Sequence, residues 1–257
     1  DVHQGSWLCE AALWCHWTHV GKLEAASGCR LLFVEAAGLK RTLAEHVAIA
    51  SATKAYCRSF HARLTCAVPP HAHWPSDVSL PFEASELLST SLGIALSHRA
   101  RREGHLSEDQ AAALEEQLQS GLCTLQPATG RSGGIERIIS SVAVRLKHDD
   151  RTFMQVGKAE EGEGVQAACR LPRTKRKAEE TPQKALERLL ETSLRPLAPH
   201  IAVERSEHSV LRGASEQRFG VLTTYVQTVH TARLQTSFED IAMPTASARE
   251  PLDVPEL

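Results

Sequence analysis

The segment that most constrains this chain runs from Leu171 to Leu194, where a basic stretch leads into an amphipathic helix. Thr181 is suited to cap the start of this helix, and Pro182 suits its first position, where a missing N–H breaks no hydrogen bond. The apolar residues that follow recur at helical spacing and make one face: Ala185, Leu186, Leu189, Leu190 and Leu194. The segment therefore predicts a surface helix packed on a sheet.

The same segment resembles the Nudix box, in which a glycine, a glutamate and an arginine stand at fixed spacing ahead of further glutamates. Thr174 takes the glycine position here, Glu180 matches the first glutamate, and Arg188 matches the arginine. The resemblance implies a Nudix-like αβα sandwich within residues 126–236. The order of expected elements agrees, because β-rich segments stand on both sides of the box helix.

The three later glutamate positions of the box hold Leu189, Thr192 and Ser193. In the family those carboxylates hold Mg²⁺ or Mn²⁺ against a diphosphate, and a hard divalent cation requires several oxygen anions. We therefore expect a pseudoenzyme that needs no cofactor. The alternative is a hydrolase of nucleoside diphosphate derivatives, with Mg²⁺, Glu180 and Arg188 at its catalytic site and carboxylates from outside the box.

The basic side chains of the box are candidate phosphate-binding residues. Arg173, Lys175 and Arg176 stand close together, and guanidinium groups make charge-assisted hydrogen bonds to phosphate without any metal. This predicts that the second domain binds a phosphorylated small ligand. The alternative is a solvated basic loop, since runs of charge usually lie at the surface.

The β-rich segments of the second domain can be assigned from their composition. Residues 135–147 and 151–157 read as a hairpin, and residues 201–210 and 221–234 are rich in residues that favour strands. The tail over residues 237–257 carries three prolines and many small or acidic residues, which predicts disorder.

Residues 1–68 form a separate unit in which the run LCEAAL is followed by a histidine and two short apolar stretches. Residues 20–27 and 30–36 read as short strands, and residues 37–66 read as helical. This order resembles the second half of a cyclic-nucleotide-binding domain: a phosphate-binding cassette, a strand, and lid helices. The resemblance implies a partial β-roll with C-terminal helices.

The cassette is degenerate at the residue that matters most for phosphate. Glu10 and Ala11 match the motif, but His19 stands where the family has an arginine that pairs with the cyclic phosphate. Histidine is shorter and mostly neutral at pH 7, so cyclic nucleotide binding should be lost. This pattern resembles the cyclic-nucleotide-homology domains of ether-à-go-go-type potassium channels. It implies a fragment on the cytosolic side of a membrane protein, an upstream channel or signalling domain as partner, and a homo-oligomer.

The connector over residues 69–125 begins with a proline-rich stretch and continues into helices. A helix is expected within residues 83–102, and Ser107 with Gln110 forms a capping box for a second helix. A helical connector of this kind could also serve as a protein-interaction scaffold.

Two groups of possible metal ligands also occur. Cys9, Cys15, His16 and His19 lie close in sequence, but their spacing is not that of a zinc finger. His71 and His73 form an H-x-H pair, for which a solvated loop is the simpler interpretation.

Composition sets the remaining bounds. The 257 residues carry a net charge of −2, so no global field favours nucleic acid. No apolar run approaches the roughly 18 residues of a membrane span, and no signal peptide is recognisable. The seven cysteines are an odd number and scattered, which favours reduced thiols and a cytoplasmic setting. Together these features predict an α+β, non-enzymatic regulatory segment.

Overall fold

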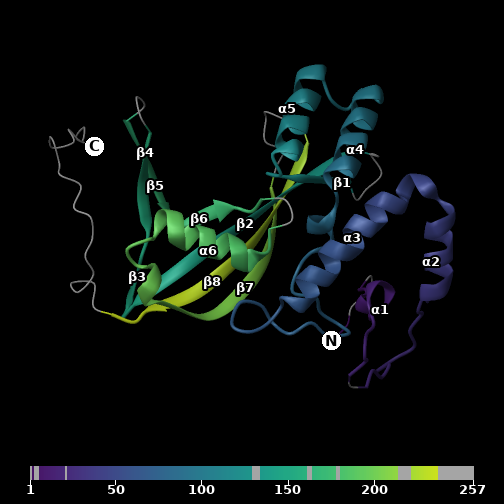
Figure 1. The fold of residues 1–257 in the computed structure, drawn as a ribbon, viewed down its shortest axis with the longest axis horizontal. Coiled ribbons are helices and arrows are strands. Elements are labelled where there is room, and N and C mark those ends of the chain that lie inside the picture. The colour runs from purple at the N-terminus through teal and green to yellow at the C-terminus, as the bar shows by residue number, and fades with distance from the viewer. Residues whose placement is uncertain are drawn as a thin grey trace.

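The protein is described by a computed structural model that covers residues 2, 6–20, 22–128, 134–160, 164–177, 180–213 and 221–236. The fold is α+β, as the sequence predicts, with the first five α-helices gathered at one end of a mixed sheet and the sixth lying on the sheet (Figure 1). The tail that was expected to be disordered, residues 237–257, lies outside the described residues. Among the described helices, none is long and apolar enough to cross a membrane.

The first unit contains three helices, and aromatic packing joins the first of them to the third. They are α1 (Ala11–Trp14), α2 (Ala36–Glu45) and α3 (Val47–Thr65). Phe60 of α3 is fully buried, and its ring meets that of Phe82, from the connector, at a centroid distance of 5.2 Å. The first unit and the connector therefore share one small core.

The two short strands expected at residues 20–27 and 30–36 are wrong for the residues described there, which form no strand. Leu32 and Phe33 are 94% and 85% exposed. Strand propensity is realised only when a neighbouring strand satisfies the backbone, and the described part of the chain places none beside this run. The partial β-roll stays a prediction.

The connector contains a 3₁₀ turn, η1 (Ala84–Leu87), and two α-helices, α4 (Thr90–Arg102) and α5 (Glu108–Gln119). The helix expected within 83–102 is interrupted at Leu88, whose backbone is extended, and it restarts where Ser89 caps α4. The Ser107–Gln110 capping box is confirmed, since each side chain accepts a hydrogen bond from the backbone N–H of the other residue.

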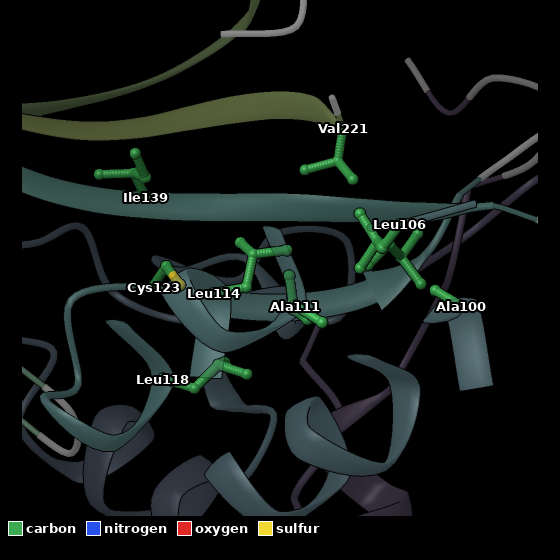
Figure 2. Packing of buried hydrophobic residues seen from close by; sticks show 10 residues of the cluster. Ala100, Leu106, Ala111, Leu114, Leu118, Cys123, Ile139 and Val221 are labelled. Carbon is green, nitrogen blue, oxygen red and sulfur yellow. The ribbon is translucent and has the colours of Figure 1, made fainter. Parts of the chain in front are cut away.

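The connector helices share a core with the sheet, so they are more than a linker. Their apolar side chains pack against β2 (Ile135–His148) and against Val221, which precedes β8 (Leu222–Leu234). Figure 2 shows Leu114 and Leu118 of α5 in the same cluster as Ile139 of β2. The domain boundary expected at residue 126 falls inside β1 (Thr124–Pro127), which pairs with β2.

The sheet has β2 and β8 at its centre and follows the order β1-β2-β8-β7. β2 and β8 run parallel over twelve residue pairs from Glu136↔Leu222 to Lys147↔Arg233, and β7 (Ile201–Gly213) is antiparallel to β8. The predicted strands at 135–147, 201–210 and 221–234 are therefore confirmed. β3 (Arg151–Thr152) closes the expected hairpin on β2 across Asp149, which has a positive φ of 51°.

Of the remaining strands, two form a separate hairpin and one pairs with β2 of the main sheet. β4 (Gln155–Glu160) and β5 (Gly164–Arg170) form a separate hairpin that projects away from the helical end (Figure 1). β6 (Arg173–Lys175) pairs antiparallel with β2. The basic stretch expected to be a loop is thus a strand at this point, because its backbone bonds to β2.

The amphipathic helix is confirmed as α6 (Pro182–Ser193), with Thr181 Oγ1 accepting the capping hydrogen bond from the Lys184 N–H at 3.3 Å. Its apolar face is buried against β2 and β8, and a 3₁₀ turn, η2 (Ala198–His200), leads into β7. The predicted helix packed on a sheet is therefore confirmed, whereas the specific Nudix sandwich stays a prediction.

Candidate functional site

A cleft of about 580 Å³ lies where the first unit, the connector and the second domain meet. Its walls come from α3, from η1 and the start of α4, from β2, and from the residues between β6 and α6. These segments are far apart in sequence, so the cleft exists only in the complete fold.

The floor of the cleft is a buried ion cluster of two arginines and one glutamate. Glu86 Oε2 lies 2.6 Å from Arg176 Nη1 and 3.2 Å from Arg63 Nη1. All three side chains are at most 6% exposed. Burial of the guanidinium, and then the proximity of Arg176, lower the pKa of Arg63 to about 10. Two buried cations therefore share a single buried carboxylate.

Further groups around the cleft add to its positive character. Arg58 and Lys177 also line it, so the described lining residues include four basic side chains and one carboxylate. The N-terminal residues of α4 and the N-cap of α6, Thr181, lie on the same walls. The start of a helix carries a partial positive charge and free N–H groups, which favour a bound anion. Hydroxyl groups that line the cleft, from Ser89, Thr90 and Ser91, can also donate hydrogen bonds.

Only one of the three predicted phosphate-binding residues lies in this cleft. Arg173 and Lys175 are exposed on β6, and Arg176 turns inward because its backbone N–H bonds the Ser140 carbonyl of β2 at 2.9 Å. No local pattern links Arg176 with Arg63, which lies 113 residues earlier on α3. A buried arginine next to a buried glutamate is a property of the tertiary fold alone.

Glu180 and Arg188, the two residues named for the hydrolase alternative, are engaged with one another. Arg188 Nε donates to Glu180 Oε1 and its Nη2 donates to Oε2, both at 2.8 Å. The hydrogen bond from Arg188 lowers the pKa of Glu180. At the positions where the box would have further glutamates, Leu189 is buried in the core and Thr192 bonds the carbonyl of Arg188. The box segment thus acts as a structural brace around α6.

The residues of the degenerate nucleotide cassette have separate partners. Glu10 accepts a hydrogen bond from the Tyr56 hydroxyl at 3.4 Å, and Ala11 is buried in the aromatic core. His19 lies 2.8 Å from Asp77 of the connector. These contacts serve packing between helices and the connector.

A smaller hollow of about 50 Å³ beside the cleft is lined by histidines and a serine. Ser206 Oγ donates to the Pro70 carbonyl at 2.7 Å and lies 2.6 Å from Nδ1 of the buried His230. A serine has one proton, so His230 Nδ1–H donates to Ser206, and the hydroxyl is not activated as a nucleophile. Burial, and then His71, lower the pKa of His230 to about 4.

The two groups of possible metal ligands in the sequence have different surroundings in the structure. Of Cys9, Cys15, His16 and His19, the structure brings together Cys9 and His19, and it adds Asp77 to them. In the H-x-H pair, His73 bonds Ser79 at 3.0 Å and His71 packs edge-on against His230. Asp77 was missed because it lies 58 residues beyond His19 in a proline-rich stretch.

No protein-family model matches this sequence, and a comparison with curated proteins finds no match either.

Proposed function

We propose that this chain is a non-enzymatic regulatory segment whose cleft binds a phosphorylated small ligand. The observation that carries the proposal is the pair of buried guanidinium groups, Arg63 and Arg176, that share the single carboxylate of Glu86. A buried charge without a full partner is costly, and an anion in the cleft would supply the missing negative charge.

The shape of the cleft supports a phosphate ester or diphosphate as the ligand. Arginine donates paired hydrogen bonds that match the oxygens of phosphate, and two helix starts on the walls add partial positive charge. Serine and threonine hydroxyls that line the cleft can bond the rest of a polar small molecule. The volume is within the range of small-molecule sites.

The engagement of Glu180 with Arg188 supports the non-enzymatic assignment. A carboxylate whose two oxygens both accept hydrogen bonds from one guanidinium is a poor ligand for a free Mg²⁺ ion. We therefore expect no product when the chain is incubated with nucleoside diphosphate derivatives and Mg²⁺. Product release that is abolished in Glu180→Gln would favour the hydrolase alternative instead.

Binding can be tested by isothermal titration with inorganic pyrophosphate, comparing the wild type with Arg176→Gln. This substitution leaves Arg63 and Glu86 as a one-to-one pair, so folding should survive while one charged donor is lost. A hydrogen bond to a charged group is worth about 1.5–3 kcal/mol, which corresponds to about 10–100-fold weaker binding.

The matched control is Arg173→Gln, which removes an exposed arginine three residues away on β6. Its affinity for pyrophosphate should stay within about threefold of the wild type, because exposed charges are screened. Equal affinity in the wild type and Arg176→Gln, or no binding at millimolar pyrophosphate, would refute the proposed ligand site.

The first unit is proposed to contact an upstream channel or signalling domain on the cytosolic side of a membrane. The exposed apolar run from Leu31 to Val34 supports a partner there, since contiguous exposed apolar side chains mark interaction surfaces.

Titration with cAMP and cGMP should give no heat at micromolar ligand, and a sub-micromolar dissociation constant would contradict the loss of cyclic nucleotide binding. Analytical ultracentrifugation tests the homo-oligomer that the channel resemblance implies.

A further inference from the structure

Three potential metal ligands from two distant segments meet beside the first helix. Cys9 Sγ, a ring nitrogen of His19 and a carboxylate oxygen of Asp77 all lie within 4.8 Å of one another. Within the described residues this is the one group of histidine, cysteine and acidic side chains close enough to share an ion.

The backbone and neighbouring side chains hold this group in place. The Cys9 N–H donates to the Asp77 carbonyl at 2.7 Å, and Cys9 adopts a positive φ of 57°. Trp17 Nε1 donates to Asp77 Oδ1 at 2.7 Å, and the Val20 N–H donates to Oδ2 at 3.0 Å. Bonds of this kind orient ligating carboxylates in known metal sites.

The thiol and the imidazole of this group both carry protons that a metal ion can displace. His19 Nδ1 lies 2.8 Å from Asp77 Oδ1, and Cys9 Sγ lies within 4.8 Å of the ligand atoms of both residues. An ion that enters would release the thiol proton to solvent and leave His19 protonated on Nε2. That ring is largely exposed, so Nε2–H can be hydrated. The metal would therefore take the places of the thiol proton of Cys9 and the Nδ1 proton of His19. The three ligating side chains already lie close together without it.

We propose that Cys9, His19 and Asp77 form a binding site for a divalent transition-metal ion, with Zn²⁺ as the best match. One thiolate, one imidazole and one carboxylate are all established ligands of zinc. The edges of a tetrahedral site with these ligands are roughly 3.3–3.7 Å long, so the group needs shifts of only about an ångström. The exposure of His19 leaves a water molecule as the fourth ligand.

The consequence of this site would be a link between the first unit and the connector. Residues 9 and 19 flank α1, whereas residue 77 lies in the loop ahead of η1. Binding of an ion to the folded state alone stabilises that state in proportion to the logarithm of the metal concentration. The site would thus fasten two segments that the fold otherwise joins by hydrogen bonds and packing.

The test uses the full, reduced chain with Co²⁺ alone and then with Zn²⁺ in competition. We expect one equivalent of Co²⁺ to produce both a sulfur-to-metal charge-transfer band and tetrahedral d–d absorption, and Zn²⁺ should abolish both. Cys9→Ser should lose the charge-transfer band. Cys66→Ser, which changes an exposed cysteine elsewhere, is the matched control and should retain it.

Two further variants separate ligation from folding. His19→Ala removes a largely exposed side chain, so the fold should persist while Zn²⁺ affinity falls by at least about tenfold. Trp17→Phe removes the orienting N–H together with one ring of the indole, and it should weaken Zn²⁺ binding by about 10–100-fold with the spectrum unchanged. A charge-transfer band that survives in Cys9→Ser, or Zn²⁺ affinity that is unchanged in His19→Ala, would overturn the proposal. Absence of any Co²⁺ spectrum in the wild type would do the same.

Discussion

Replacing Glu86 by glutamine should cost this protein a large share of its stability. The substitution keeps the shape of the side chain, replaces one carboxylate oxygen by an NH₂ group, and removes the charge that Arg63 and Arg176 share. At separations of 2.6 and 3.2 Å, and with an effective dielectric constant of about 20, each attraction is worth about 5–6 kcal/mol before desolvation is subtracted. Both guanidinium groups would remain buried, so the measured loss should be about 3–5 kcal/mol.

Urea unfolding followed by tryptophan fluorescence measures this loss. The control is Glu204→Gln, which breaks a 2.8 Å pair with Arg233 at the exposed edge of the sheet and should cost at most about 0.5 kcal/mol. Inorganic phosphate should restore more stability to Glu86→Gln than to the wild type, because an anion replaces the lost carboxylate. A loss below about 1 kcal/mol in Glu86→Gln, or no difference in the response to phosphate, would refute the reasoning.

Other consequences can be checked by unfolding measurements. Gly93→Ala should destabilise the protein by about 1–2 kcal/mol, since the added Cβ would lie 2.7 Å from Leu118 Cδ2 in the core. The loss should be smaller in a Leu118→Ala background, and equal losses would contradict a clash. For His230, the pKa in the folded state is lowered from 6.5 to about 4, so the unfolded chain binds the extra proton first as the pH falls. Stability should drop by up to about 3 kcal/mol between pH 6.5 and 4, and His230→Gln should flatten this dependence. Arg188→Lys should lower the thermal midpoint, with a loss of about 1 kcal/mol, because lysine cannot make both bonds to Glu180; an unchanged midpoint would show that the pair contributes nothing.

Local patterns in the sequence were sufficient for the elements with their own caps and periodicity. The start of α6 follows from Thr181 and Pro182, and that of α5 from Ser107 and Gln110, because capping depends on residues within one turn. The long strands β2 and β8 were also identifiable, since their β-branched runs are continuous. The structure of the segment around Leu32 could not be predicted in this way. Its apolar composition is typical of a strand, but a strand also needs a neighbouring strand to pair with.

The position of the candidate site could not be predicted from the sequence. Arg173, Lys175 and Arg176 are all predicted to bind phosphate, and of these three the structure places Arg176 in the cleft. Which of three neighbouring basic residues turns inward depends on the pairing of β6 with β2, which places alternate side chains on opposite faces. The partners of Arg176 come from α3 and η1, and no local pattern encodes contacts over such separations.

The parallel pairing of β2 with β8 bears on how the protein is made. A ribosome releases β2 long before β8, since the two strands are separated by more than 70 residues of intervening chain. The α4–α5 hairpin is local and can form early, but one side of β2 must wait for the strand that completes it. During that delay an apolar strand edge is accessible to other nascent chains, so synthesis at high concentration should depend on a chaperone.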